Sequence, residues 1–153
     1  MRFSWFSMLG GLTLALAPSL TTAPVAASND ATPSTRGNAV TTDAYSVWLE
    51  TVGNYQAGKP GELRVVVEAK APHKCNVEYP YKFTFGTAPQ GVTYPTPVVH
   101  DMKVDGKHAS MQLPIAPAAA GKATVQGILN FSVCTEDKCL IEKGDLSIPI
   151  TIN

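Results

Sequence analysis

The sequence is poor in charge and carries no excess of either sign. Charged residues make up 16% of its 153 positions, and 12 Lys and Arg side chains balance 12 Asp and Glu. This balance gives no reason to expect nucleic acid or an anionic membrane as a partner. Familiar catalytic patterns are also missing, since there is no glycine-rich phosphate loop, Ser/His/Asp arrangement or paired-carboxylate signature. Enzymes that depend on those motifs are therefore not expected.

Long apolar runs are almost absent. The one such run, Phe3 to Ala17, follows a single basic residue, Arg2, and is shorter than the roughly 20 residues of a membrane helix. Small residues at Val25 to Ala27 follow it. This layout predicts a signal peptide over residues 1–27, and hence an exported protein without stable membrane insertion. We expect a periplasmic location, with an extracellular one and an uncleaved anchor helix as alternatives.

A polar segment follows the signal. Residues 28–42 (SNDATPSTRGNAVTT) have almost no apolar content, which predicts a flexible leader. The remaining residues, 43–153, suffice for one domain with its own hydrophobic core.

Short runs of alternating apolar and polar residues fill this domain. Period two over four to eight residues is the pattern of a half-buried strand. Proline and glycine separate the runs, and no window shows an amphipathic helix. The sequence therefore predicts an all-β domain, an immunoglobulin-like antiparallel β-sandwich of about six or seven strands. Its inward-facing residues are expected in the runs 45–49, 63–69, 79–85, 111–115, 125–133 and 146–152.

Aromatic residues in these runs have structural interpretations. Tyr79, Tyr81, Phe83 and Phe85 share one parity and are expected to form one inward strand face. Trp48 falls on the outward parity and is interpreted as cover for a sheet edge, with a contact role as the alternative.

Three cysteines remain: Cys75, Cys134 and Cys139. If Phe131 and Val133 face the core, Cys134 faces away from it, and the parity of the last strand turns Cys139 outward too. Opposed residues of an antiparallel pair have Cα atoms about 4.5–5.5 Å apart, and a disulfide spans about 4.4–6.8 Å. Cys134 and Cys139 can therefore bond across a tight hairpin without a backbone shift.

Such a bond would be an inefficient structural staple. Its short ring removes about 2 kcal/mol of unfolded-chain entropy, against about 4 kcal/mol for a bond from Cys75 to Cys134. A local surface disulfide is better suited to attack by a partner's thiolate, although the structural interpretation stays open.

A metal site is a third alternative. His73 and Cys75, together with Cys134 and Cys139, could supply four ligands for zinc or copper(I). The spacing of the second pair is wider than in most zinc knuckles, and we interpret His73 as a solvated loop residue. No cofactor is therefore predicted.

The segment VQGILNFSVCTEDKCL, followed by a last apolar strand, resembles the N-terminal domain of the DsbD thiol:disulfide interchange proteins. The likeness extends upstream through CNVEYPYKFTF and PQGVTYPTPVVHDMKVDGKHASMQLPI, and covers roughly Leu63 to Ile152. The stretch that matches the family's cap loop, Met102 to Gly106, lacks the aromatic residue that the family places over its disulfide.

The resemblance implies a function. It makes Cys134 and Cys139 the active pair, with Cys139 forming the mixed disulfide, and implies thioredoxin-like or other exported redox proteins as partners. We therefore expect an exported thiol–disulfide exchange module. The alternative is a non-catalytic exported β-sandwich that binds another protein and holds a structural Cys134–Cys139 disulfide.

These expectations predict how the cysteines are paired. Protein purified from an oxidising compartment should carry a Cys134–Cys139 disulfide, with Cys75 unpaired or linked to another molecule. Non-reducing peptide mapping checks this pairing, and a bond from Cys75 to either of the other two cysteines would contradict it.

Overall fold

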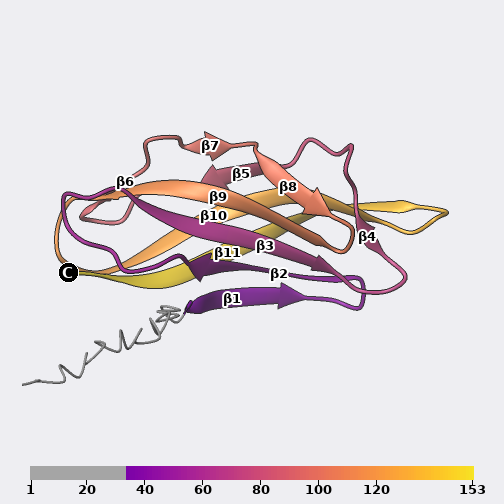
Figure 1. Ribbon diagram of the computed structural model, residues 1–153, viewed down its shortest axis with the longest axis horizontal. Helices are drawn as coiled ribbons and strands as arrows, with labels where there is room; N and C mark the ends of the chain where they lie inside the picture. The colour runs from indigo at the N-terminus through magenta and orange to yellow at the C-terminus, as the bar shows by residue number, and fades with distance from the viewer. Residues whose placement is uncertain (1–33) are drawn as a thin grey trace, which may run out of the picture. The chain divides into compact units, whose positions relative to one another are not determined.

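The structure is a computed structural model that describes residues 34–153. Eleven strands, joined by turns and loops, lie within this range (Figure 1). The described residues contain no helix, and so none that is long and apolar enough to cross a membrane. The strands are β1 (Arg36–Thr41), β2 (Tyr45–Thr51), β3 (Gly61–Ala69), β4 (Lys74–Cys75), β5 (Lys82–Phe85), β6 (Val92–Thr93), β7 (Val98–Val99), β8 (Met102–Asp105), β9 (His108–Pro117), β10 (Gly121–Cys134) and β11 (Cys139–Ile152).

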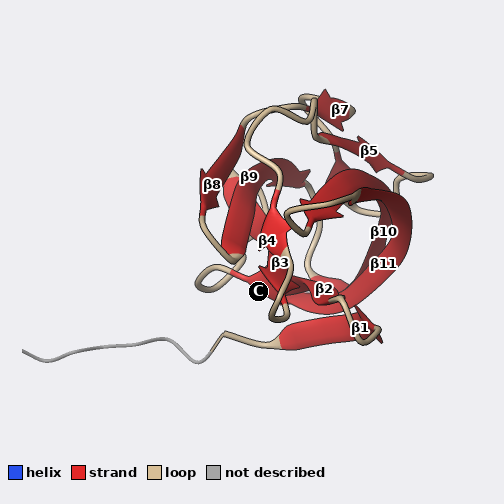
Figure 2. Cartoon of the chain, turned by 90° about the vertical axis from the view of Figure 1, so that its right-hand side faces the viewer, coloured by secondary structure: helices blue, strands red, loops and turns tan. Residues whose placement is uncertain are grey.

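The strands pair into two antiparallel sheets. One has the order β1-β2-β3-β9-β6, with β8 also paired to β9, and the other has the order β11-β10-β5-β7, with β4 also paired to β10. In Figure 2, β10 and β11 curve strongly around one side of the domain. The predicted fold class, an immunoglobulin-like antiparallel sandwich in a single domain, is confirmed.

The core follows the period-two pattern of the sequence. Every residue predicted to face inward is buried, except Tyr79, which is half-buried. Tyr45 of β2 meets Phe131 of β10 edge to face, with ring centroids 4.8 Å apart, so aromatic packing joins the two sheets. Burial of this apolar surface is the main stabilising contribution to the fold.

The predicted end of the polar leader is wrong. Residues 36–41 lie inside the expected leader, yet they form β1 and pair with β2. The side chain of Asn38 also reaches the other sheet, because its Oδ1 accepts hydrogen bonds from the amide of Ser147 at 2.5 Å and from its hydroxyl at 3.1 Å. A strand that bridges two sheets through backbone and amide hydrogen bonds needs little apolar content. The predicted signal peptide, residues 1–27, and the first part of the leader lie outside the described residues.

Trp48 faces outward, as its parity predicts, but only 5% of its surface is exposed. The strand β1 covers it: Ala39 is its cross-strand partner, and the guanidinium of Arg36 lies 3.8 Å from its ring centroid. Its indole nitrogen donates to the carboxylate of Glu50 at 3.3 Å. Trp48 was interpreted as covering a sheet edge. Instead, the edge strand β1 covers Trp48.

The longest element is the ladder between β10 and β11. Its register runs unbroken from the pair Gly121–Ile152 to the pair Cys134–Cys139. Gly127 lies in the middle of β10, and a Cβ atom there would overlap the ring of Phe83 and the carbonyl of Thr84. The absence of a side chain at this position therefore allows β5 and its aromatic residues to pack against the ladder.

Gly127→Ala is expected to destabilise the fold by about 1–3 kcal/mol, because the rigid Phe83 ring must move. The matched control is Gly86→Ala, whose added Cβ would meet nothing closer than 3.4 Å. Urea unfolding of both variants measures the difference, and equal midpoints would contradict this account of the packing.

Candidate functional site

Cys134 and Cys139 form a disulfide at the last pair of the β10–β11 ladder, as the sequence predicted. Their Cα atoms are 4.0 Å apart. The next pair toward the turn is joined by a backbone hydrogen bond of 2.8 Å, from the amide of Thr135 to the carbonyl of Lys138. Cysteines directly beside such a pair occupy a non-hydrogen-bonded position, where side chains approach most closely. Strand pairing alone therefore brings the two sulfur atoms within bonding reach.

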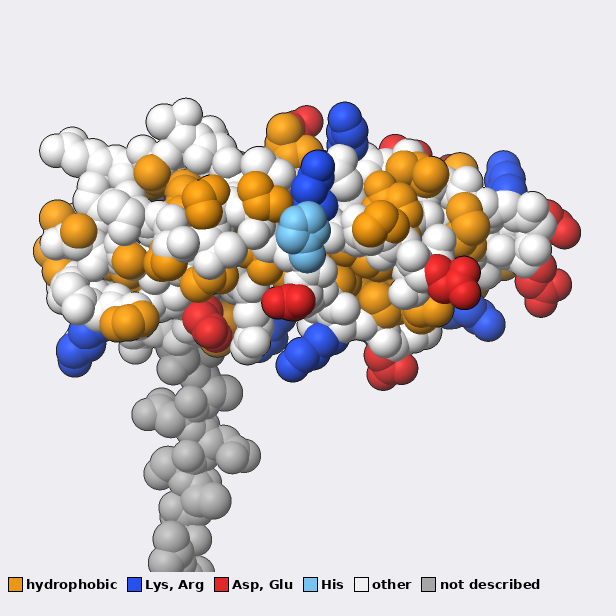
Figure 3. Space-filling view, turned by 90° about the horizontal axis from the view of Figure 1, so that it is seen from above, with side chains coloured by type: hydrophobic (Ala, Val, Ile, Leu, Met, Phe, Trp, Pro, Cys, Tyr) orange, Lys and Arg blue, Asp and Glu red, His pale blue; other side chains and the backbone are white. Residues whose placement is uncertain are grey.

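A tight turn closes the hairpin beyond the disulfide. The hydroxyl of Thr135 accepts hydrogen bonds from the amides of Asp137 and Lys138, both at 3.3 Å. The side chains of Glu136, Asp137 and Lys138 are all exposed. In Figure 3, acidic and basic side chains both occur at the end of the domain from which this hairpin projects in Figure 1. The disulfide thus lies beside a solvated, charged turn.

The two cysteines are unequally exposed. Cys139 is exposed, because β11 is the outer strand of its sheet. Cys134 is half-buried, because β10 is an inner strand and Lys74 of β4 lies opposite Cys134. Residue exposure therefore favours Cys139 as the cysteine that an incoming thiolate meets first.

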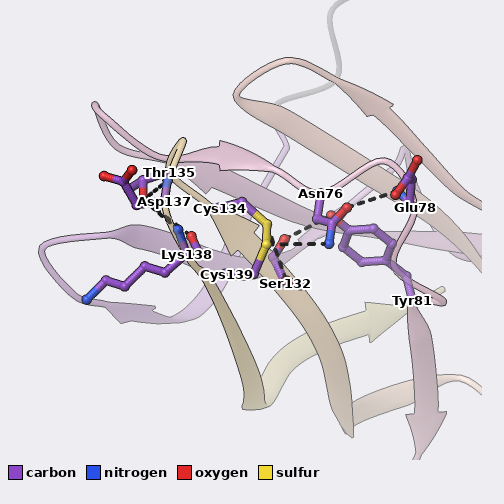
Figure 4. Close-up of a disulfide and its surroundings, with 9 residues drawn as sticks. All are labelled: Asn76, Glu78, Tyr81, Ser132, Cys134, Thr135, Asp137, Lys138 and Cys139. Atoms are coloured by element: carbon purple, nitrogen blue, oxygen red, sulfur yellow. Dashed lines mark hydrogen bonds between the residues drawn. A yellow bond between two sulfur atoms is a disulfide. The ribbon is translucent and has the colours of Figure 1, made fainter.

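Asn76 reaches the disulfide from a distant part of the chain (Figure 4). Its side-chain amide donates to the sulfur of Cys139 at 4.0 Å, and its Oδ1 accepts from the amide of Glu78 at 3.0 Å. Its own backbone amide donates to the carbonyl of Ser132 at 3.0 Å. The backbone and the side chain of Asn76 are thus both held in place, and strand periodicity did not predict this contact.

Ser132 lies beside the other sulfur atom. Its hydroxyl oxygen is 3.9 Å from the sulfur of Cys134. Ser132 faces away from the core, as its parity predicts, yet its exposed fraction is 0%. The segment after β4 covers it, since Tyr81 donates a hydrogen bond of 3.1 Å to its carbonyl alongside Asn76. Each sulfur of the disulfide therefore has one side-chain group close by that can donate a hydrogen bond to it.

The stretch interpreted as a cap loop, Met102 to Gly106, forms a strand and a turn. Met102–Asp105 forms β8, and Gly106 follows in a turn whose carbonyl accepts a hydrogen bond of 2.9 Å from the amide of Cys75. The contacts that the structure gives to the disulfide sulfurs come from Asn76 and Ser132.

Cys75 faces the core and is 5% exposed. Its cross-strand partner is Val133, and its thiol donates to the carbonyl of Lys107 at 3.4 Å. Burial raises its pKa to about 11, so at neutral pH it is a protonated, protected thiol. Its side chain and that of the outward-facing Cys134 lie on opposite faces of the sheet.

The alternative metal site is not assembled. Within residues 34–153, no three His, Cys, Asp or Glu side chains lie close enough together to hold a metal ion. Cys134 and Cys139 are bonded to each other, and Cys75 faces the opposite side of the sheet. His73 lies in the loop before β4, as expected, but it is half-buried and its Nδ1 is buried without a hydrogen-bond partner among the described residues, so it is less solvated than the sequence predicted.

Two exposed apolar side chains lie near the disulfide. Val77, directly after Asn76, is 72% exposed, and Ile141, two residues after Cys139 on the same strand face, is 70% exposed. They are the two most exposed large apolar side chains of the described region. Val77 and Cys134 both line a hollow of about 560 Å³. The disulfide therefore has exposed apolar side chains and a hollow close to it.

No protein-family model and no curated protein matches the chain. Among solved structures, the chain is similar to the GAE domain of GGA2p from Saccharomyces cerevisiae, with 14% identity and a TM-score of 0.36. That match covers 75% of this chain and 98% of the other.

Removing the disulfide should cost little stability. The double variant Cys134→Ser, Cys139→Ser is expected to lose about 2 kcal/mol and to remain folded, because the ladder sets the hairpin register without the bond. Urea unfolding of the oxidised protein and the variant measures the difference. A double variant that is unfolded at room temperature would instead identify the bond as a necessary staple.

Proposed function

We propose that this protein is an exported thiol–disulfide exchange module, which passes electrons to or from thioredoxin-like partner proteins through Cys134 and Cys139. The observation that carries the proposal is a disulfide at the exposed end of a hairpin whose register the strand pairing already sets. The resemblance to the N-terminal domain of DsbD proteins and the signal-like segment at residues 1–27 support an exported, periplasmic role.

Placement of the bond argues against a purely structural role. The ladder already fixes the register of β10 against β11 over its whole length, from Gly121–Ile152 onward. A cross-link gains most when it closes a long loop, and this one closes a very short ring. The buried Cys75 would have allowed a longer ring, but its thiol faces the other side of the sheet.

Unequal exposure of the two cysteines gives the exchange a direction of attack. A partner's thiolate attacks the exposed Cys139 sulfur, a new bond forms between partner and Cys139, and the Cys134–Cys139 bond breaks with Cys134 leaving as a thiolate. A second thiol of the partner then attacks the partner's sulfur in the mixed disulfide, and Cys139 leaves as a thiolate. The partner is oxidised by two electrons, and this protein becomes a dithiol that can reduce the next protein.

The surroundings fit a protein partner better than a small thiol. Val77 and Ile141 offer exposed apolar surface on which a partner can bury its own apolar residues during the exchange. The carboxylates of Glu136 and Asp137, in the turn between the cysteines, cancel the attraction that Lys74 and Lys138 would offer to a thiolate in the reduced protein. A dithiol in these surroundings reacts slowly with unselected disulfides and suits a dedicated partner.

Trapping of the mixed disulfide tests this function. Cys134→Ser keeps the accessible Cys139 thiol and removes the resolving thiol, so its adduct with an oxidised thioredoxin-fold protein should persist. The matched control is Cys139→Ser, in which only the half-buried Cys134 remains at the site. We expect at least about tenfold less adduct from the control on non-reducing gels and by mass spectrometry.

The same experiment separates the alternative function. A non-catalytic binding domain with a structural disulfide would give no adduct from either variant. Equal trapping by both variants would contradict the assignment of Cys139 as the attacked sulfur.

A further inference from the structure

The hydroxyl of Ser132 is a buried donor paired only with a weak acceptor. Ser132 is 0% exposed, and the one hydrogen-bond partner the structure gives its hydroxyl is the Cys134 sulfur at 3.9 Å. Because that sulfur is bonded to Cys139 and carries no hydrogen, only the hydroxyl can donate. Buried hydroxyls usually pair with oxygen or nitrogen, whereas cysteine sulfur accepts weakly. In the oxidised protein this donor is therefore poorly satisfied.

The position of Ser132 is nevertheless fixed, by its place on β10 and by hydrogen bonds to its carbonyl. Ser132 precedes Cys134 by two residues on β10, so both side chains lie on the outward face of the strand. Its carbonyl accepts hydrogen bonds from the amide of Asn76 and the hydroxyl of Tyr81, which hold the covering segment over it (Figure 4). The hydroxyl is thus held out of contact with water, beside the sulfur of Cys134.

We propose that Ser132 donates a hydrogen bond to the Cys134 thiolate that leaves when a partner attacks Cys139. This role rests on the proposed exchange function. As the Cys134–Cys139 bond breaks, its electron pair stays on the Cys134 sulfur, which changes from a weak acceptor to an anion. Hydrogen bonds to anions are shorter and about twice as strong as those between neutral groups, so the donor is satisfied only in the reaction product.

The charges around Cys134 make such a donor useful. Lys74 lies opposite it on β4, and the turn beyond carries Glu136, Asp137 and Lys138. The two carboxylates offset the two ammonium groups, so the turn and β4 together offer the departing anion little net attraction. A thiolate that is better stabilised leaves faster, which makes the Ser132 hydroxyl a determinant of the rate of opening.

Asn76 holds the equivalent position at the other sulfur. Its amide donates to Cys139 at 4.0 Å, and its Oδ1 is already engaged by Glu78. When Cys139 is released from a mixed disulfide, it too departs as a thiolate beside a fixed donor. Each cysteine therefore has its own donor for the step in which it is the leaving group.

The test measures the acidity of Cys134 without any partner. In a Cys139→Ala background, Cys134 is the accessible thiol, and the rate of its alkylation by iodoacetamide is followed against pH. Adding Ser132→Ala should raise the midpoint of this pH profile by about one pH unit, which corresponds to a tenfold loss of Cys134 thiolate near neutral pH. With both cysteines present, Ser132→Ala should also slow opening of the disulfide by dithiothreitol several-fold.

Matched variants separate the hydroxyl from packing. Ser132→Thr keeps a hydroxyl and should retain the parent midpoint, whereas Ser132→Gly removes it and replaces the alanine variant if that one does not fold. An unchanged midpoint in the variants lacking the hydroxyl, or an equal rise in the threonine variant, would overturn the proposal. Because no partner is involved, a failure of this test leaves the trapping result standing, and a failure to trap leaves this measurement standing.

Discussion

The continuous pairing of β10 with β11 is the constraint on which the rest of the structure depends. This ladder supplies inward residues such as Phe131 and Ile148 to the core, and its curvature brings β11 to β1, where Asn38 bonds to Ser147. It also fixes which residues stand opposite each other at its far end. A shift of register by one residue would turn every side chain of a strand to the other face, so the position of the disulfide and the composition of the core are set together.

Burial then gives the three cysteines different properties. Cys75 is enclosed between the sheets, where burial raises its pKa to about 11 and keeps it protonated. Cys134 is half-buried on an inner strand, and Cys139 is exposed on an outer strand. The proposed order of attack follows from this gradient together with the donors Ser132 and Asn76. It requires no unusual backbone geometry and no additional catalytic group.

Sequence patterns predicted the parts of this structure that depend on strand periodicity. The inward residues from Tyr45 to Ile152 and the opposed cysteines follow from alternation, because a strand presents alternate residues to each face. Contacts made by segments that cover a sheet were not predictable in this way. The strand β1 forms from polar residues because it pairs with β2 and bonds to β11, and Asn76 reaches Cys139 across 63 residues of chain. Such contacts depend on where the covering segments lie in space, which local periodicity does not record.

The reduction potential of the Cys134–Cys139 pair tests the account most directly. Structural disulfides of secreted proteins lie below about −300 mV, and labile exchange disulfides lie above that value. Equilibration of a Cys75→Ala variant with glutathione or dithiothreitol buffers measures the pair alone, with alkylation and mass spectrometry as the readout. The exchange function predicts a potential above about −300 mV, whereas a value well below it would identify the bond as structural and contradict the account.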